Sequence, residues 1–193
     1  MAKLYFFYGT MGSSKTVQAH MSHHNYKERK NSTIFMQPAI ADRKGAGISE
    51  SRIGTKVNVD VSVKAGENIK ELIEDQLVNG LDVIFIDEAE FLTAKQVNEL
   101  SDIAIEFDVP VLCYGLRTDF RGDWFEGSEA LMKIADKITE IKTTCWCGKK
   151  ATMNARLNAA GDMVVDGEQV AIGYNYIGLC REHFLKRQPH DTK

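Results

Sequence analysis

An apolar run followed at once by a loop of small residues and a Lys-Thr pair is the feature that most restricts how this chain can fold. The run covers residues 3–8, the loop covers residues 9–14 (GTMGSS), and Lys15-Thr16 opens a helical pattern. A buried strand, a glycine-containing loop and a helix in this order are typical of a phosphate-binding loop. Backbone N–H groups and the positive end of the helix then surround phosphates, the lysine reaches the outer phosphates and the hydroxyl binds Mg²⁺.

One loop position departs from the usual pattern G-x-x-x-x-G-K-[ST], because Ser14 stands where the second glycine is expected. That position often needs a left-handed backbone conformation, which glycine adopts freely and serine adopts with modest strain. The other interpretation of the segment is a serine-rich turn that caps an ordinary helix.

A second motif, which is acidic, complements the predicted phosphate loop. Residues 81–86 (LDVIFI) predict a buried strand, and Asp87-Glu88 follow it directly. In phosphate-loop enzymes an aspartate at such a strand end holds Mg²⁺, and a glutamate can act as a base on the nucleophile. The alternative is an acidic pair that caps the next element. Gly9, Asp87 and Gly115 each follow a predicted strand, so we expect them to converge at one edge of a parallel sheet.

Strands alternate with helices along most of the chain. The pattern predicts strands at 3–8, 32–37, 81–86 and 109–114, helices at 15–29, 68–79, 93–107 and 128–137, and an edge strand at 137–141. Thr93 and Gln96 have the spacing of a capping box at the start of the third helix. This is the α/β class with a parallel sheet flanked by helices. Residues 39–66 show weak periodicity and predict a long loop, either a lid over a nucleotide or a plain solvated excursion.

The histidines of the first helix and the aromatic residues at 115–125 each allow a structural and a functional interpretation. His20, His23 and His24 are expected to be surface or helix-packing histidines, because nothing near them completes a metal site. We expect Val17, Met21 and Tyr26 to form the packed face of the same helix. Residues 115–125 (GLRTDFRGDWF) suit either a flat ligand such as a nucleobase or a loop that anchors itself.

Charge and apolar length exclude several classes of protein. The net charge is −3 and the pI is near 6, which argues against a large nucleic-acid footprint. No apolar run approaches the ~18 residues that a membrane span requires. The N-terminus lacks the layout of a signal peptide, so we expect a cytoplasmic protein whose thiols stay reduced.

Three of the four cysteines then predict a metal site. Cys145 and Cys147 are followed much later by Cys180 and His183, a ligand set for tetrahedral Zn²⁺. Four protein ligands leave no open position, so the zinc is expected to be structural. An alternative is a zinc ribbon that binds nucleic acid through Lys149, Lys150, Arg156 and Arg181, which the acidic balance opposes. Cys113 lies within an apolar run and is expected to be a core thiol.

Taken together, these motifs resemble the type II, zinc-containing thymidine kinases, and the spacing C-x-C-G-x-K-A at 145–151 is similar to their enteric-bacterial and phage branch. The resemblance runs from Lys3 to about Phe184. It rests on the loop with Met11 and Lys15-Thr16, the segments 42–43 and 51–54, DEAEF at 87–91, GLRTDF at 115–120, and the Cys/His quartet.

The resemblance implies a P-loop, RecA-like parallel sheet over residues 1–142, a zinc-binding lobe with a lasso loop over 143–188, and a tail at 189–193. It implies transfer of the γ-phosphate of ATP to the 5′-hydroxyl of thymidine or deoxyuridine, with Mg²⁺, in deoxynucleoside salvage for DNA synthesis. A homotetramer is implied in the same way. Neither a membrane nor a nucleic-acid partner is expected.

The resemblance also implies roles for individual residues. Glu88 matches the proton acceptor, Lys15 the phosphate clamp, and Arg43 an arginine near the reacting phosphate, while Thr16 and Asp87 match the Mg²⁺ positions. The ATP-binding positions are Gly9, Thr10, Met11, Gly12, Ser13, Ser14, Lys15, Thr16, Asp87, Glu88, Ala89 and Glu90. The thymidine-binding positions are Met11, Phe91, Leu116, Phe120, Phe125, Val170, Ala171, Ile172, Gly173 and Tyr176.

Three residues depart from the family pattern. Ser14 replaces the loop glycine, Ala41 replaces an acidic residue, and Glu90 stands where glutamine is usual. Ser14 and Ala41 motivate an alternative to the kinase, a weakly active or non-catalytic homologue that binds nucleotides.

Overall fold

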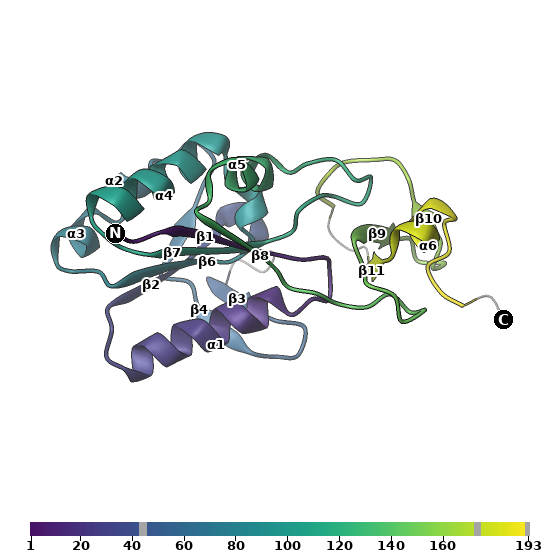
Figure 1. The fold of residues 1–193 in the computed structure, drawn as a ribbon, viewed down its shortest axis with the longest axis horizontal. Coiled ribbons are helices and arrows are strands. Elements are labelled where there is room, and N and C mark those ends of the chain that lie inside the picture. Colours follow the sequence, from purple (N-terminus) through teal and green to yellow (C-terminus); the bar gives the residue numbers. More distant parts are fainter. Residues whose placement is uncertain (43–45, 172–174, 192–193) are drawn as a thin grey trace.

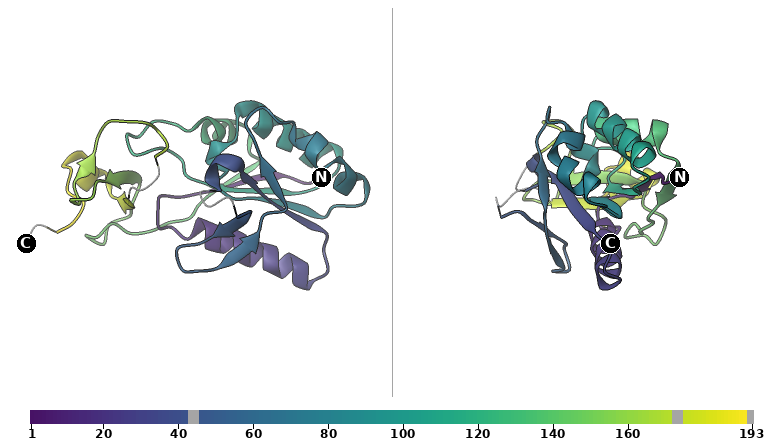
Figure 2. Two further views of the ribbon diagram at one scale, coloured as in Figure 1. Left: turned by 180° about the vertical axis from the view of Figure 1, so that it is seen from behind. Right: turned by 90° about the vertical axis from the view of Figure 1, so that its left-hand side faces the viewer.

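The computed structural model describes residues 1–42, 46–171 and 175–191. Its centre is a six-stranded sheet in the order β5-β2-β6-β7-β1-β8, and all the pairings between these strands are parallel. Helix α1 covers one face and helices α2 to α5 cover the other (Figure 1). The end-on view in Figure 2 shows the same three layers, and the predicted α/β class is therefore confirmed.

The sheet strands are β1 (Leu4–Tyr8), β2 (Thr33–Pro38), β5 (Val61–Val63), β6 (Val83–Ile86), β7 (Val111–Gly115) and β8 (Lys137–Glu140). The helices around them are α1 (Lys15–Glu28), α2 (Ile69–Leu72), α3 (Glu74–Val78), α4 (Ala94–Glu106) and α5 (Glu126–Ile134), with short 3₁₀ turns η1 (Ala39–Ala41) and η2 (Ala89–Phe91). The predicted strands match within a few residues.

Both faces of the sheet are buried, and the side chains of each strand alternate between them as the pleat requires. Phe35 and Phe85 pack on the α1 side, whereas Ile34 and Ile84, their chain neighbours, belong to the larger cluster under α4. Helix α4 starts at the capping box predicted for Thr93 and Gln96. Cys113 is fully buried in β7, so the prediction of a core thiol is confirmed.

The strands that carry the predicted site lie next to one another. Strand β7 lies between β1 and β6, so their carboxyl ends share one edge of the sheet. The N–H of Gly9 donates to the carbonyl of Gly115 at 3.3 Å. Gly9 has no room for a side chain, since a Cβ there would lie 2.4 Å from both Ser13 Oγ and the carbonyl of Ile141. The predicted convergence of Gly9, Asp87 and Gly115 is confirmed.

The prediction that residues 39–66 form one long loop is wrong for the described part of that segment. Strands β3 (Ile48–Glu50) and β4 (Lys56–Asn58) make a hairpin, and β5 joins the edge of the main sheet. The signal that was missed is a period of two, because valines at 57, 59, 61 and 63 alternate with polar residues. Asp60 ties this segment to β2 by accepting from the N–H of Phe35 at 2.8 Å.

Three helical predictions need smaller corrections. The helix predicted at 68–79 is broken at Ile73 into α2 and α3. Of its apolar stripe, Ile69, Ile73 and Leu77 are buried, whereas Leu72 is 37 % exposed, so the stripe is wrong at Leu72. The helix predicted from residue 128 begins at Glu126. On α1, the buried side chains are Ala19, His20 and His23. Tyr26 packs against Phe85 as expected, whereas Met21 is 60 % exposed, so the predicted face is wrong at Met21.

The C-terminal lobe comprises β9 (Met153–Leu157), β10 (Met163–Val164), β11 (Asn175–Leu179), α6 (Arg181–Leu185) and the turn that carries Cys145 and Cys147. Its three strands form a separate sheet in the order β10-β9-β11. The lobe lies at one end of the long axis of the molecule (Figure 1). Among the helices in the described residues, none combines the length and apolarity of a membrane span.

Candidate active site

A cavity of about 770 Å³ opens at the carboxyl edge of the sheet. Its walls come from the loop before α1, the end of β6, the start of the loop after β7, and the β3–β4 hairpin. Lys15, Asp87 and Glu88 line the same space. Of the other predicted ATP-binding and thymidine-binding positions, Met11, Gly12, Ser14, Thr16 and Leu116 also line it.

The loop before α1 has the backbone conformation that the sequence pattern requires. Ser14 adopts the left-handed conformation, with φ 65° and ψ 25°, at the N-cap of a helix of 14 residues. Its side chain makes no capping hydrogen bond, so the N-terminal end of α1 faces the cavity without a side-chain cap. Backbone N–H groups at such an end attract anions. This geometry suits a phosphate group.

Lys15 contributes a positive charge to the cavity wall. Its Nζ donates to the carbonyl oxygen of Thr10 at 3.0 Å. Burial lowers the pKa of Lys15, and the nearby Glu90, Glu88 and Asp87 oppose that shift. A buried ammonium whose hydrogen-bond partner is a neutral carbonyl has capacity to bind an anion that enters the cavity.

Asp87 is buried at the end of β6 and accepts two hydroxyl hydrogen bonds. Thr16 Oγ1 donates to Oδ1 at 3.3 Å, and Ser49 Oγ donates to Oδ2 at 2.9 Å. Burial raises the pKa of Asp87 to about 7, and the charge of Glu88 adds to the shift, while the two hydroxyl groups oppose it. Thr16 and Asp87 are therefore adjacent oxygen groups of the type that Mg²⁺ binds.

The two glutamates after Asp87 differ in surroundings. Glu88 lies on the cavity wall in the left-handed conformation, with φ 54° and ψ 37°. Strained non-glycine residues of this kind concentrate at functional sites. Glu90 is 2 % exposed, and neither of its carboxylate oxygens has a hydrogen-bond partner of good geometry among the described residues. Burial raises its pKa well above the usual range, with a further contribution from Glu88, although Lys15 opposes the shift.

The β3–β4 hairpin supplies a wall that the sequence analysis missed. Ser51, Arg52 and Ile53 in its turn line the cavity, together with Ile48 and Lys56 from its strands. Arg52 lies in the segment 39–66 that was predicted to be a loop. Its Nη2 donates to the carbonyl of Tyr176 at 3.2 Å. The valine alternation signals strands in this segment, but it does not indicate where the hairpin packs.

The aromatic positions predicted to contact thymidine are not among the residues that line the cavity. Phe120 and Phe125 are buried, and Phe91 packs edge-on against Phe125 with ring centroids 5.4 Å apart. The guanidinium of Arg156 lies 3.8 Å from the ring centroid of Phe120, and its Nε donates to Tyr176 Oη at 2.8 Å. Arg156 therefore joins the loop after β7 to β11, a role that the sequence analysis did not assign to it.

Other predicted positions have different surroundings. Ala89 is buried, and Val170 is 37 % exposed. Tyr176 Oη donates to the carbonyl of Ala171 at 3.3 Å. Arg43, Ile172 and Gly173 lie outside the described residues.

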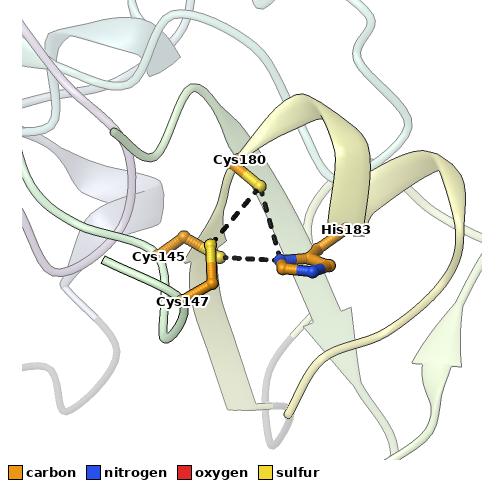
Figure 3. A group of neighbouring side chains, drawn as sticks. All are labelled: Cys145, Cys147, Cys180 and His183. Atoms are coloured by element: carbon orange, nitrogen blue, oxygen red, sulfur yellow. Dashed lines mark hydrogen bonds between the residues drawn. The ribbon is translucent and has the colours of Figure 1, made fainter. Parts of the chain in front are cut away.

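Three cysteines and a histidine meet in the C-terminal lobe (Figure 3). The ligand atoms of Cys145, Cys147, Cys180 and His183 lie within 4.8 Å of one another. His183 Nδ1 is 3.5 Å from Cys145 Sγ and 3.4 Å from Cys180 Sγ, and the sulfurs of Cys147 and Cys180 are 3.9 Å apart. A tetrahedral zinc with ordinary bond lengths separates two sulfurs by about 3.8 Å and a sulfur from a nitrogen by about 3.6 Å. The quartet therefore fits zinc.

The pKa of Cys145 supports the same conclusion. Burial by itself raises the pKa of the Cys145 thiol, but hydrogen bonds from the backbone at Cys147 and Cys180 and from His183 outweigh it and lower the pKa to about 6. A thiolate is the form that binds a metal.

The lobe also contacts the loop before α1 through hydrogen bonds. Asn154 of β9 accepts from the N–H of Met11 at 2.8 Å and donates to the carbonyl of Thr118 at 2.7 Å. Of the basic residues considered for nucleic-acid binding, Lys149 pairs with Glu182, Lys150 pairs with Glu140, and Arg156 is buried.

Comparison with known proteins identifies the family. The family model described as "Thymidine kinase" matches residues 2–184. A thymidine kinase of Rhodopirellula baltica is 47 % identical over 187 residues, which are 95 % of this chain and 88 % of that protein. A thymidine kinase of Escherichia coli is 42 % identical over 194 residues, 100 % of this chain and 95 % of that protein. Among solved structures, the Pif1 helicase of Candida albicans aligns with a TM-score of 0.42 at 12 % identity. The alignment covers 72 % of this chain and 36 % of that chain, and the likeness is weak. The chain belongs to the thymidine kinase family.

Proposed function

We propose that this protein transfers the γ-phosphoryl group of ATP to the 5′-hydroxyl of thymidine. The observation that carries the proposal is the shared cavity, because Lys15, Asp87 and Glu88 line one space at the N-terminus of α1. Relatives named thymidine kinase at 42 % and 47 % identity, aligned over nearly the whole chain, support the choice of substrate.

The residues of the cavity fit the parts that phosphoryl transfer requires. In our proposal the loop at 9–16 holds the ATP phosphates, and Lys15 places its charge on the outer phosphates. Thr16 and Asp87 would hold Mg²⁺, which neutralises charge on the phosphates when bound. Their oxygens are adjacent in the structure, because Thr16 donates to Asp87 at 3.3 Å.

Glu88 is the proposed proton acceptor. It takes the proton of the 5′-hydroxyl as the hydroxyl oxygen forms a bond to the γ-phosphorus and the bond to the β–γ bridging oxygen breaks. Thymidine monophosphate and ADP are the products. The position of Glu88 on the cavity wall supports this role, and so does its backbone conformation.

The base is proposed to bind between the loop after β7 and β11. Met11 and Leu116 line the cavity, and Arg52, which also lines it, donates to the carbonyl of Tyr176. Arg156 joins Tyr176 to Phe120 of the loop after β7. In this proposal zinc in the C-terminal lobe is structural and keeps β9 and β11 in place. The proposal also includes a homotetramer in the cytoplasm, as the family resemblance implies, and analytical ultracentrifugation tests the assembly.

The test is an assay of ATP-dependent phosphorylation across the four common deoxynucleosides, repeated with Glu88→Gln. We expect thymidine monophosphate from the wild type and a fall in kcat of about 10²- to 10⁴-fold in the variant, because the base is lost while shape is kept. Glu74→Gln, on the exposed side of α3, is the matched control and should keep full activity. Unchanged turnover in Glu88→Gln would remove Glu88 from the mechanism, and no product with any nucleoside would refute the kinase.

A further inference from the structure

We propose that His20 is a positioning residue for the phosphoryl-transfer site, because it holds the β3–β4 hairpin against α1 and, through Ser49, fixes the orientation of the Asp87 carboxylate. This inference rests on the proposed function and extends it to a residue outside the cavity wall. His20 is 4 % exposed and lies on the first turns of α1, after the phosphate loop.

A continuous chain of hydrogen bonds connects His20 to Asp87. His20 Nε2 is 2.8 Å from Ser49 Oγ, and Ser49 Oγ donates to Asp87 Oδ2 at 2.9 Å. The other ring nitrogen, Nδ1, is 2.9 Å from Thr55 Oγ1, which lies 2.6 Å from Ser51 Oγ. Ser49 belongs to β3 and Thr55 directly precedes β4, so a single imidazole contacts both arms of the hairpin.

The protons of this chain can be assigned from donor capacity. When Asp87 is in the ionised form that Mg²⁺ binding requires, it only accepts hydrogen bonds, so the single hydroxyl proton of Ser49 is used on Asp87. Ser49 must then accept from His20, which places the ring proton on Nε2. Burial lowers the pKa of His20 to about 4, and His23 adds to the shift, so the ring is neutral near pH 7. Nδ1 is therefore an acceptor, and it shares the hydroxyl proton of Thr55 with Ser51 Oγ.

The hairpin that His20 holds is part of two functional regions. Its turn lines the cavity through Ser51 and Arg52. Arg52 also reaches the carbonyl of Tyr176 at the start of β11. The His20 contacts therefore connect the proposed Mg²⁺ carboxylate to the wall of the cavity and, through the hairpin, to the strand beside the proposed base site. Groups that orient metal-binding carboxylates commonly affect metal affinity or activity by about 10- to 100-fold.

His23 offers a matched comparison on the same helix. It is 3 % exposed, packs against the rings of Phe35 and Phe85, and has a hydroxyl partner, Thr33, at 3.0 Å. It differs from His20 in the elements that it contacts. Thr33 and Phe35 belong to β2 and Phe85 belongs to β6, so none of the three belongs to the hairpin. A purely structural role for buried imidazoles on α1 predicts equal effects from the two residues.

The first experiment compares His20→Leu, Ser49→Ala and His23→Leu by steady-state kinetics over a range of Mg²⁺ concentrations. We expect His20→Leu and Ser49→Ala to lower kcat about 10-fold and to raise the Mg²⁺ concentration for half-maximal rate, with His23→Leu within about twofold of wild type. The double variant His20→Leu/Ser49→Ala should be no worse than the poorer single variant, since both break one chain. His20→Gln, whose amide N–H can replace Nε2–H, should recover part of the rate.

The second experiment does not depend on catalysis. Hydrogen exchange of residues 48–58 in the nucleotide-free protein should be faster in His20→Leu and in Thr55→Val than in wild type or His23→Leu. Equal exchange in all four proteins, strictly additive kinetic effects, or equal losses in His20→Leu and His23→Leu would each overturn the proposal. If the wild type fails to phosphorylate any nucleoside, the proposed function fails, and hydrogen exchange still tests whether His20 holds the hairpin.

Discussion

The six-stranded sheet and the C-terminal lobe are stabilised by different means. The sheet is packed on both faces, and its larger cluster joins strands β1, β2, β5, β6 and β7 with helices α2 to α5. The lobe has a cluster of four buried residues, Cys145, Ala155, Leu179 and Cys180, and two of these are predicted metal ligands. Apolar burial increases with domain size, so a unit as small as the lobe needs another source of stability.

This difference explains where each region tolerates unfavourable features. The sheet retains a buried carboxylate without a good partner at Glu90 and a left-handed serine at position 14, because its packing outweighs such local costs. In the lobe, loss of the proposed zinc should act directly on folding. The lobe nevertheless contributes to the proposed active site through Asn154 and Tyr176.

The largest expected effect is the loss of zinc. Cys145→Ser, or treatment of the wild type with a strong chelator, should remove about 10 kcal/mol of stabilisation and unfold the lobe while the six-stranded sheet remains folded. Hydrogen exchange should show lost protection in β9 and β11 and retained protection in β1 and β7, and elemental analysis should show less than one zinc per chain.

The remaining cysteine gives the control for this experiment. Cys113 is buried in β7, far from the quartet in the sequence, so Cys113→Ala should keep the zinc content and the protection of β9. If β9 and β11 stay protected from hydrogen exchange after complete loss of zinc, then zinc is not what stabilises the lobe, and the proposed difference between the two regions is wrong.

A smaller effect is expected at Glu90. Replacing its buried carboxylate by the neutral amide in Glu90→Gln should stabilise the nucleotide-free protein by about 1–3 kcal/mol near pH 8. The pKa of Glu90 is raised in the folded state, so the folded wild type binds more protons than the unfolded chain and loses stability as pH rises above about 4.5. The gain in Glu90→Gln should therefore be larger at pH 8 than at pH 5.

Urea unfolding at the two pH values measures this difference. Glu74→Gln, at an exposed position on α3, is the control for the change of net charge. A gain that is equal at both pH values, or a loss of stability, would show that the Glu90 carboxylate has an adequate partner in the folded state.

The smallest effect is expected at the phosphate loop. Because Ser14 has φ 65°, Ser14→Gly should raise the free energy of unfolding by no more than about 1 kcal/mol and change kcat by less than about threefold. Lys30 has φ 64° and lies beyond the end of α1. Lys30→Gly is therefore the control for the effect on stability of placing glycine at a left-handed position outside the proposed site. The alternative of a non-catalytic homologue predicts instead that Ser14→Gly with Ala41→Asp creates a large gain in turnover.

Local signals carried most of the predictions that the structure confirmed. The apolar runs located the sheet strands, the capping box located α4, and the Cys and His spacing located the metal quartet. The failures have different causes. The valine alternation from 57 to 63 was overlooked, and on α1 the buried positions belong to two histidines whose ring nitrogens bind hydroxyl groups of Ser49, Thr55 and Thr33.

The sequence by itself determined the order of most strands and helices, the loop with Lys15-Thr16, the acidic strand end at Asp87-Glu88 and the Cys/His quartet, because each depends on residue types at short or regular spacing. Only the tertiary structure decided that the β3–β4 hairpin closes the cavity, that Arg156 packs on Phe120, and that His20 reaches Asp87 through Ser49. These contacts join residues far apart in the chain. No local pattern encodes them, since they depend on how packed elements bring distant side chains together.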